Sequence, residues 1–221
     1  MTDAADRVLI AQRPLGTHLA GGWEFPGGKL EPGEERLKGL ARELHEELGI
    51  SIIGTPRPLI RVRHAYPSRE VVLDMWVVKR YHGEPHGLDG QALRWCTQDE
   101  LATTELLPAD KPIVAALRLP ERLRQASAPH YSIGELGSFG RPAISADSHA
   151  VARLRGVFCA GPDQGVAAAQ AGADFLVMRE PLADVELAAL CDRVAAPIFA
   201  RGIGLERAWE LGASGVHKIN I

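Results

Sequence analysis

The amino-acid sequence predicts an α+β protein in two parts that are joined by a linker. In the first part, residues 1–122, short apolar runs of strand type alternate with two stretches of helical pattern. In the last part, residues 143–221, a helix, a Gly-Ala-Asp or Gly-Ala-Ser turn and a short apolar strand recur. Such alternation is typical of parallel βα units. Residues 123–142, rich in Pro, Gly and Ser, are the predicted linker, with one short strand at 130–133.

The elements of the first part follow from local signals. Residues 1–6 predict a turn and residues 8–12 a strand. An amphipathic helix follows the Pro32-Gly33 turn and runs to about Leu48, where Gly49 suits its end. The later elements are strands at 59–65, 70–81 and 91–96, a helical turn at 100–106, and a helix at 108–119.

Composition excludes several classes of function. The 221 residues are 46% hydrophobic and 24% charged, as in ordinary globular proteins. A formal charge of −3 and a pI near 6.2 do not favour direct binding of nucleic acid. Three widely spaced cysteines predict reduced thiols in the core, and no segment has the pattern of a signal peptide or a membrane span. We therefore expect a cytoplasmic protein.

The predicted first helix carries an unusual set of carboxylates. Glu43, Glu46 and Glu47 stand at i, i+3 and i+4, so they share one face of the helix. Like charges at this spacing repel each other, and a helix rich in glutamate is ordinarily a solvated face. A hard divalent cation such as Mg²⁺ would turn the repulsion into binding. The spacing, with the glycines beside it, favours a metal site.

This stretch resembles the Nudix box, and its surroundings are similar to the MutT subfamily of Nudix hydrolases. The resemblance covers about the first 120 residues and implies an α/β/α sandwich. Outside the box, residues 24–29, 82–85, 89–91 and 107–112 are similar in order and spacing. The fixed positions of the box are matched by Gly28, Glu34, Arg42, Glu43, Leu44, Glu46, Glu47, Gly49 and Ile50.

The resemblance implies a catalytic role for several of these residues. Glu46, Glu47 and the Gly27 carbonyl would hold Mg²⁺, with Mn²⁺ as a substitute. Glu43 would bind metal or take the proton from the attacking water, and Asp89 would act as a ligand or auxiliary base. Arg42 would fix the rotamer of a box carboxylate, and Glu34 would brace the loop or reach a metal.

A nucleotide pocket is implied as well. Arg13, His18 and Arg69 match positions near phosphate, sugar or base, and Phe25 and Tyr66 would flank the base. Asp110 stands where the subfamily has an asparagine that reads the oxidised purine. An ionised carboxylate only accepts hydrogen bonds, but a buried, protonated Asp110 could also donate. The remaining expected substrate-binding residues are Glu24, Pro26, Gly27, Gly28 and Lys29.

Other interpretations stay open at this stage. Arg13 and Arg69 could form surface ion pairs, and Asp89 could be a plain turn residue. Members of the subfamily have a further strand before the one at residues 8–12, for which this chain has no room. Either the start is truncated or another segment fills that edge.

The last part resembles the later portion of thiamine-phosphate synthase, a TIM barrel. About 90 residues are too few for a barrel, and Arg201-Gly202 stands where that family has two glycines. We expect a partial, degenerate TIM-barrel-like βα region without synthase activity, which packs on the first domain or forms a homodimer.

The sequence therefore predicts a Mg²⁺-dependent hydrolase that converts oxidised purine nucleoside triphosphates, such as 8-oxo-dGTP, to the monophosphate and pyrophosphate. This activity would sanitise the nucleotide pool. The alternatives are hydrolysis of another nucleoside diphosphate derivative and a Nudix module that senses a nucleotide without turnover. Coupling of a thiazole to a pyrimidine phosphate is a third hypothesis.

Overall fold

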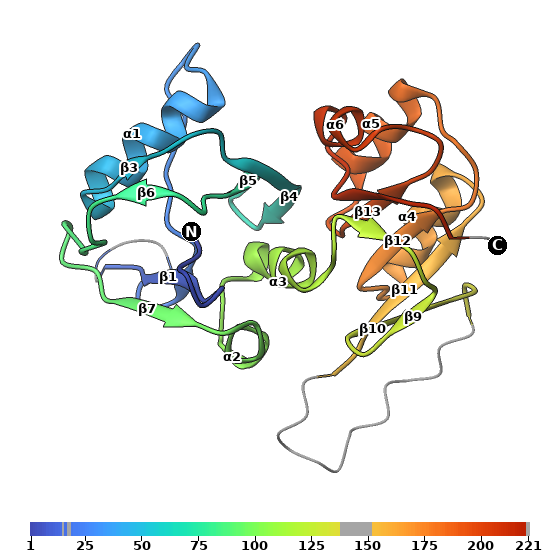
Figure 1. Cartoon of the computed structure of the whole chain (residues 1–221), viewed down its shortest axis with the longest axis horizontal. Helices are drawn as coiled ribbons and strands as arrows, with labels where there is room; N and C mark the ends of the chain where they lie inside the picture. Colours follow the sequence, from blue (N-terminus) through green and yellow to red (C-terminus); the bar gives the residue numbers. More distant parts are fainter. Residues whose placement is uncertain (15, 17–18, 138–151, 220–221) are drawn as a thin grey trace. The chain divides into compact units, whose positions relative to one another are not determined.

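The computed structural model describes residues 1–14, 16, 19–137 and 152–219 (Figure 1). The chain divides into two compact units, each made of two segments. Unit 1 comprises Met1–Arg57 and Trp76–Asp110, and unit 2 comprises Pro58–Met75 and Lys111–Ile221. The division differs from the predicted boundary at residue 122, because two segments of the predicted first domain are grouped with the C-terminal region.

A three-stranded antiparallel sheet and one helix form the centre of unit 1. Strand β1 (Val8–Gln12) lies between β2 (Trp23–Glu24) and β7 (Leu93–Cys96). Helix α1 (Arg36–Leu48) contributes Leu44 and Leu48 to a buried cluster with Leu9 of β1. Strands β3 (Ser51–Ile52) and β6 (Tyr81–His82) pair antiparallel. The predicted strand at 8–12 and the helix to Leu48 are confirmed.

Helix ends in unit 1 follow local chemistry. Gly49 has φ 69° and donates its N–H to the His45 carbonyl at 3.0 Å, so it ends α1 as predicted. Helix α2 (Gln98–Thr103) begins with a capping box between Thr97 and Glu100. The predicted helix at 108–119 is a 3₁₀ turn (Pro108–Asp110) at the end of unit 1, followed by α3 (Lys111–Arg118), which is grouped with unit 2.

The N-terminal segment supplies backbone contacts beside β1. Thr2 forms an antiparallel bridge with Val8, and its N–H donates to the Val78 carbonyl at 3.0 Å. Because β2 and β7 also flank β1, this strand is paired on both sides. The structure therefore does not leave open the strand edge that the sequence comparison left in question.

The first segment of unit 2 holds most of a two-stranded hairpin made of β4 (Arg57–Tyr66) and β5 (Arg69–Val77). The outer ends of the two strands, Arg57 and residues 76–77, are grouped with unit 1. The predicted strand at 70–81 is divided, since β5 ends at Val77 and Tyr81 begins β6. Within the unit, Arg61 of β4 lies 3.8 Å from Asp74 of β5 and 3.9 Å from Asp192.

The rest of unit 2 is a seven-stranded sheet in the order β8-β14-β13-β12-β11-β10-β9, in which every neighbouring pair except β9 and β10 is parallel. Its strands are β8 (Arg122–Leu123), β9 (Ser127–Ala128), β10 (Tyr131–Gly134), β11 (Leu154–Cys159), β12 (Phe175–Met178), β13 (Ile198–Ala200) and β14 (Gly215–His217). Helices α4 (Pro162–Gln170), α5 (Asp184–Arg193) and α6 (Leu205–Glu210) connect the later strands. The parallel βα arrangement is confirmed.

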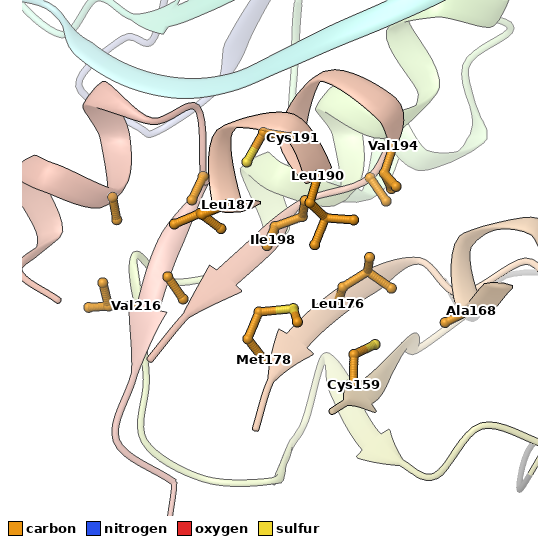
Figure 2. Close-up of a cluster of buried hydrophobic side chains, with 14 of the residues drawn as sticks. Cys159, Ala168, Leu176, Met178, Leu187, Leu190, Cys191, Val194, Ile198 and Val216 are labelled. Carbon is orange, nitrogen blue, oxygen red and sulfur yellow. The ribbon is translucent and has the colours of Figure 1, made fainter. Parts of the chain in front are cut away.

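Both faces of this sheet are apolar, as expected for parallel strands. Leu176 and Met178 of β12 belong to a cluster that includes Leu187 and Leu190 of α5 (Figure 2). Phe175, next along β12, belongs to the cluster on the other face. Cys159 and Cys191 are buried in the first cluster and Cys96 in unit 1, and all three are free, which agrees with the predicted role of thiols as core residues.

Two expectations for the C-terminal region need correction or stay untested. The predicted linker at 123–142 was expected to hold one strand, but its described residues contribute to β8, β9 and β10 of the sheet. Residues 138–151 lie outside the described part. β8 and β9 are the sheet edges in the described residues, so their pairing does not close a barrel, and the likeness to a TIM barrel stays a prediction. None of the described helices has the length and apolar character needed to cross a membrane.

Candidate active site

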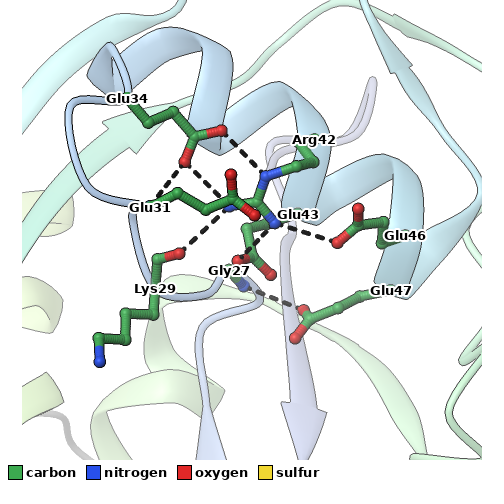
Figure 3. A network of polar contacts seen from close by, with 8 residues as sticks. All are labelled: Gly27, Lys29, Glu31, Glu34, Arg42, Glu43, Glu46 and Glu47. Atoms are coloured by element: carbon green, nitrogen blue, oxygen red, sulfur yellow. Dashed lines mark hydrogen bonds and ion pairs between the residues drawn. The ribbon is translucent and has the colours of Figure 1, made fainter.

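Arg42 is the centre of the polar network on α1 (Figure 3). Its guanidinium contacts Glu34 with two nitrogens, at 2.9 and 3.0 Å. The remaining terminal nitrogen donates to Glu43 at 2.9 Å and Glu46 at 3.1 Å, and another bond reaches the Lys29 carbonyl at 3.2 Å. The planar fork of an arginine suits such multiple contacts. The predicted pairing of Arg42 with box carboxylates is thus present, and it involves three of them.

These bonds change proton affinities in the expected directions. Hydrogen bonds from Arg42, and then from the Glu31 backbone N–H, lower the pKa of Glu34 to about 2. Hydrogen bonds to Glu34 and Glu43 raise the pKa of Arg42 above its ordinary value. Glu34 therefore stays ionised and paired with Arg42, and its role as a brace for the loop or as a metal ligand stays a prediction.

Two glycines permit close packing around this network. A Cβ at Gly28 would lie 2.0 Å from a carboxylate oxygen of Glu43. A Cβ at Gly39 would lie 2.3 Å from the Leu30 side chain and 2.9 Å from a Glu34 carboxylate oxygen. Gly39, which weakens a helix by about 1 kcal/mol relative to Ala, therefore makes room for the loop that carries Glu34.

The surroundings of Glu47 favour a bound cation. The Gly27 N–H donates to it at 3.2 Å. Burial raises the pKa of Glu47 to about 7, and the nearby carboxylates of Glu43, Glu24 and Asp89 add to the rise. A half-buried carboxylate among three others is unfavourable when ionised, and a bound divalent cation would reverse this penalty. The donor set therefore fits Mg²⁺ or Mn²⁺ chemically.

The carboxylates are not arranged as a finished coordination shell. No group of three His, Cys, Asp or Glu side chains converges in metal-binding geometry within the part of the chain that the structure describes. Arg42 engages Glu43 and Glu46, while the Gly27 N–H engages Glu47. The metal ligands Gly27, Glu43, Glu46, Glu47 and Asp89 therefore stay a prediction, and binding would require some of these hydrogen bonds to be exchanged.

A second group of charged residues lies where the base pocket is predicted. Arg13 donates to both carboxylate oxygens of Glu24, at 2.9 and 2.7 Å. Asp110 is only 5% exposed, and its burial, with the Glu24 carboxylate, raises its pKa to about 7 although Arg13 opposes the rise. A hydrogen bond from the Leu107 N–H to the Trp23 carbonyl at 3.0 Å draws the turn before Asp110 to β2. The structure thus brings Arg13, Glu24 and Asp110 together.

The other predicted pocket residues are spread over different parts of the chain. Phe25 and Pro26 are half-buried beside β2, while Lys29 is exposed and offers its carbonyl to Arg42. Tyr66 and Arg69 flank the turn of the β4–β5 hairpin in unit 2, so they are not among the residues that unit 1 assembles. His18 lies outside the described residues. The substrate contacts of all these residues stay predictions.

Comparison with known proteins identifies the first half of the chain. The NUDIX domain family matches residues 1–116, more than half of the sequence. The chain belongs to the Nudix family. An 8-oxo-dGTP diphosphatase of Escherichia coli (strain K12) is 35% identical over 116 residues, which are 51% of this chain and 87% of that relative. A CTP pyrophosphohydrolase of the same organism is 38% identical over 121 residues, covering 54% and 88% of the two chains.

Among solved structures, the E. coli ORF135 protein is similar at 38% identity and a TM-score of 0.47, over 52% of this chain and 82% of that one. The family match and the curated relatives show that the chain is a Nudix hydrolase, which acts on phosphoric anhydrides, and they confirm its likeness to MutT proteins. The family match ends at residue 116, so the likeness of the C-terminal region to thiamine-phosphate synthase stays a prediction.

One residue of this site, Gln91, is not among the residues that the sequence predicts. Gln91 binds both the end of α1 and the turn that carries Asp89. Residues 89–91 are similar to MutT proteins, but an amide side chain has neither the charge nor the metal-ligand pattern that singles out a functional residue in a sequence.

Proposed function

We propose that this Nudix hydrolase cleaves nucleoside triphosphates to the monophosphate and pyrophosphate, with Mg²⁺ as cofactor and oxidised purines such as 8-oxo-dGTP as substrates. The proposal rests chiefly on Glu47, a half-buried carboxylate beside Glu43, Glu24 and Asp89 on a scaffold braced by Arg42. A similar protein named 8-oxo-dGTP diphosphatase supports the substrate. The role of such an enzyme would be to sanitise the nucleotide pool.

The residues of the site would bind the metal, accept a proton and position the carboxylates. Glu46, Glu47, Asp89 and the Gly27 carbonyl would hold the metal, which neutralises the charge of the triphosphate. Glu43 would accept the proton of the attacking water, and the close backbone of Gly28 would limit its movement. Arg42 would orient Glu43 and Glu46 while Glu34 holds Arg42 in place.

The test is pyrophosphate release by the full chain, with and without Mg²⁺, for the wild type and Glu43→Gln. Loss of a general base lowers rates by about 10²–10⁴-fold. The matched control is Glu35→Gln, because Glu35 is exposed at the start of the same helix and pairs with Lys38 at 3.2 Å. Equal turnover by Glu43→Gln and the wild type would contradict the assigned role. Tight nucleotide binding without turnover in excess Mg²⁺ would favour a sensor instead.

Hydrolysis of CTP is the second candidate, and the protonation state of Asp110 bears on the choice between the two. An ionised Asp110 would accept a hydrogen bond from the exocyclic amino group of cytosine, whereas a protonated Asp110 could donate to and accept from an oxidised purine. The similar CTP pyrophosphohydrolase gives this alternative weight. A panel of 8-oxo-dGTP, dGTP, CTP and a sugar nucleotide, compared by kcat/KM, would separate the candidates.

A further inference from the structure

The loop between β6 and β7 closes the C-terminal end of the catalytic helix. The Leu88 N–H donates to the Glu47 carbonyl at 2.9 Å, and the His86 N–H donates to the Leu48 carbonyl at 3.1 Å. The last carbonyls of a helix lack partners within the helix, so the loop supplies them. The loop is therefore attached to the same residue, Glu47, whose side chain belongs to the predicted metal site.

The Gln91 side chain adds two hydrogen bonds to this attachment. Its side-chain Nε2 donates to the Glu47 carbonyl at 3.1 Å, and its Oε1 accepts from the Asp89 N–H at 2.9 Å. The amide thus uses its donor on the helix and its acceptor on the turn, a combination that an ionised glutamate could not supply. A Cβ at Gly87 would lie 2.0 Å from the Gln91 carbonyl oxygen, so glycine allows the turn to fold back this closely.

The Asp89 side chain itself is exposed, and the structure fixes the residue through its backbone. Its carboxylate is nonetheless near enough to raise the pKa of Glu47. The relative placement of these two carboxylates depends on how the turn is held to the helix. The Gln91 side chain bonds to the backbone of the turn and to the backbone of the helix.

We propose that Gln91 is a positioning residue, which holds the Asp89 turn against the end of α1 so that Asp89 and Glu47 face one metal–triphosphate site. This inference rests on the proposed function. It assigns Gln91 no contact with substrate, so its effect must pass through Asp89.

The first test needs neither substrate nor metal. Hydrogen exchange of residues 84–92 is measured in the wild type, Gln91→Ala and Gln91→Glu. We expect exchange at this segment to become at least several-fold faster in both variants. His86→Ala is the matched control, because its exposed ring bonds within the loop, to the Glu84 carbonyl at 2.7 Å. Unchanged exchange in Gln91→Ala would overturn the proposal. Gln91→Glu retains the size of the side chain if the alanine variant fails to fold.

The second test asks whether Gln91 acts through Asp89. Losing an outer partner of a metal ligand typically weakens metal affinity about 10–100-fold, so Gln91→Ala should weaken Mn²⁺ binding by about tenfold, measured by electron paramagnetic resonance. In an Asp89→Asn background the same change should cost little more. Full additivity of the two losses in kcat/KM and Mn²⁺ affinity would refute the coupling. A wild type without Mg²⁺-dependent turnover would instead refute the proposed function, and the exchange result would stand separately.

Discussion

Replacing Asp110 by asparagine should stabilise the folded protein at alkaline pH and leave it unchanged in acid. Asp110 is 5% exposed, and its pKa is raised from 3.8 to about 7, first by burial and then by the Glu24 carboxylate. The folded chain therefore keeps this proton at pH values where the unfolded chain has lost it. Folding stability contributed by Asp110 is complete below pH 4 and declines as the pH rises toward 7.

The size of the pKa shift of Asp110 determines how much the free energy of unfolding should change. A shift of one pKa unit corresponds to about 1.4 kcal/mol, so the rise of Asp110 from 3.8 to about 7 corresponds to about 4 kcal/mol. The asparagine side chain would carry no charge but would retain two polar groups that need partners. We therefore expect Asp110→Asn to raise the free energy of unfolding by about 2–4 kcal/mol at pH 8.5 and by less than about 0.5 kcal/mol at pH 4.

Urea unfolding followed by tryptophan fluorescence at pH 4, 6 and 8.5 measures this difference. Asp99→Asn is the control, because Asp99 is exposed in the first turn of α2, and its effect should vary little with pH. An Asp110→Asn effect that is equal at all three pH values would refute the assignment of a proton to Asp110. The same variant also bears on substrate choice, since an amide cannot ionise: its preference between 8-oxo-dGTP and CTP should lose its pH dependence.

Three further predictions concern helix α1. Gly28→Ala places a Cβ 2.0 Å from the Glu43 carboxylate, so kcat should fall by at least about tenfold with little loss of stability; an unchanged kcat would show that Glu43 moves freely. In Arg42→Lys, the single ammonium cannot contact both oxygens of Glu34 and also reach Glu43, so kcat/KM should fall by about tenfold or more. Full activity of this variant would show that the positive charge alone suffices. Mn²⁺ affinity should rise as the pH increases through about 7, because the metal competes with the proton on Glu47; calorimetry in two buffers that shows no proton release on binding at pH 6.5 would contradict this.

The sequence predicts best where a local pattern and the packing agree. The 3.6-residue period of α1, ended by Gly49, and the apolar run of β12 needed no knowledge of distant residues. The two-residue strand β8 could not be recognised, because it exists only through pairing with β14 at the far end of the sequence. Gln91 was missed for the same reason, since its role arises from a bond to Glu47 across a distant stretch of chain.

Two parts of the candidate site gather negative charge, and a different cation suits each of them. Beside α1, Arg42 faces Glu34, Glu43 and Glu46, so a single guanidinium meets three carboxylates, and Glu47 adds another nearby. That excess suits a divalent metal, because carboxylates supply the oxygen ligands that such a metal prefers. Asp110 is buried beside the Arg13–Glu24 pair, where a bound proton removes the charge instead. Adding Mg²⁺ should therefore change the titration of Glu47 and leave that of Asp110 almost unaltered, which ¹³C NMR of the labelled carboxyl groups can measure.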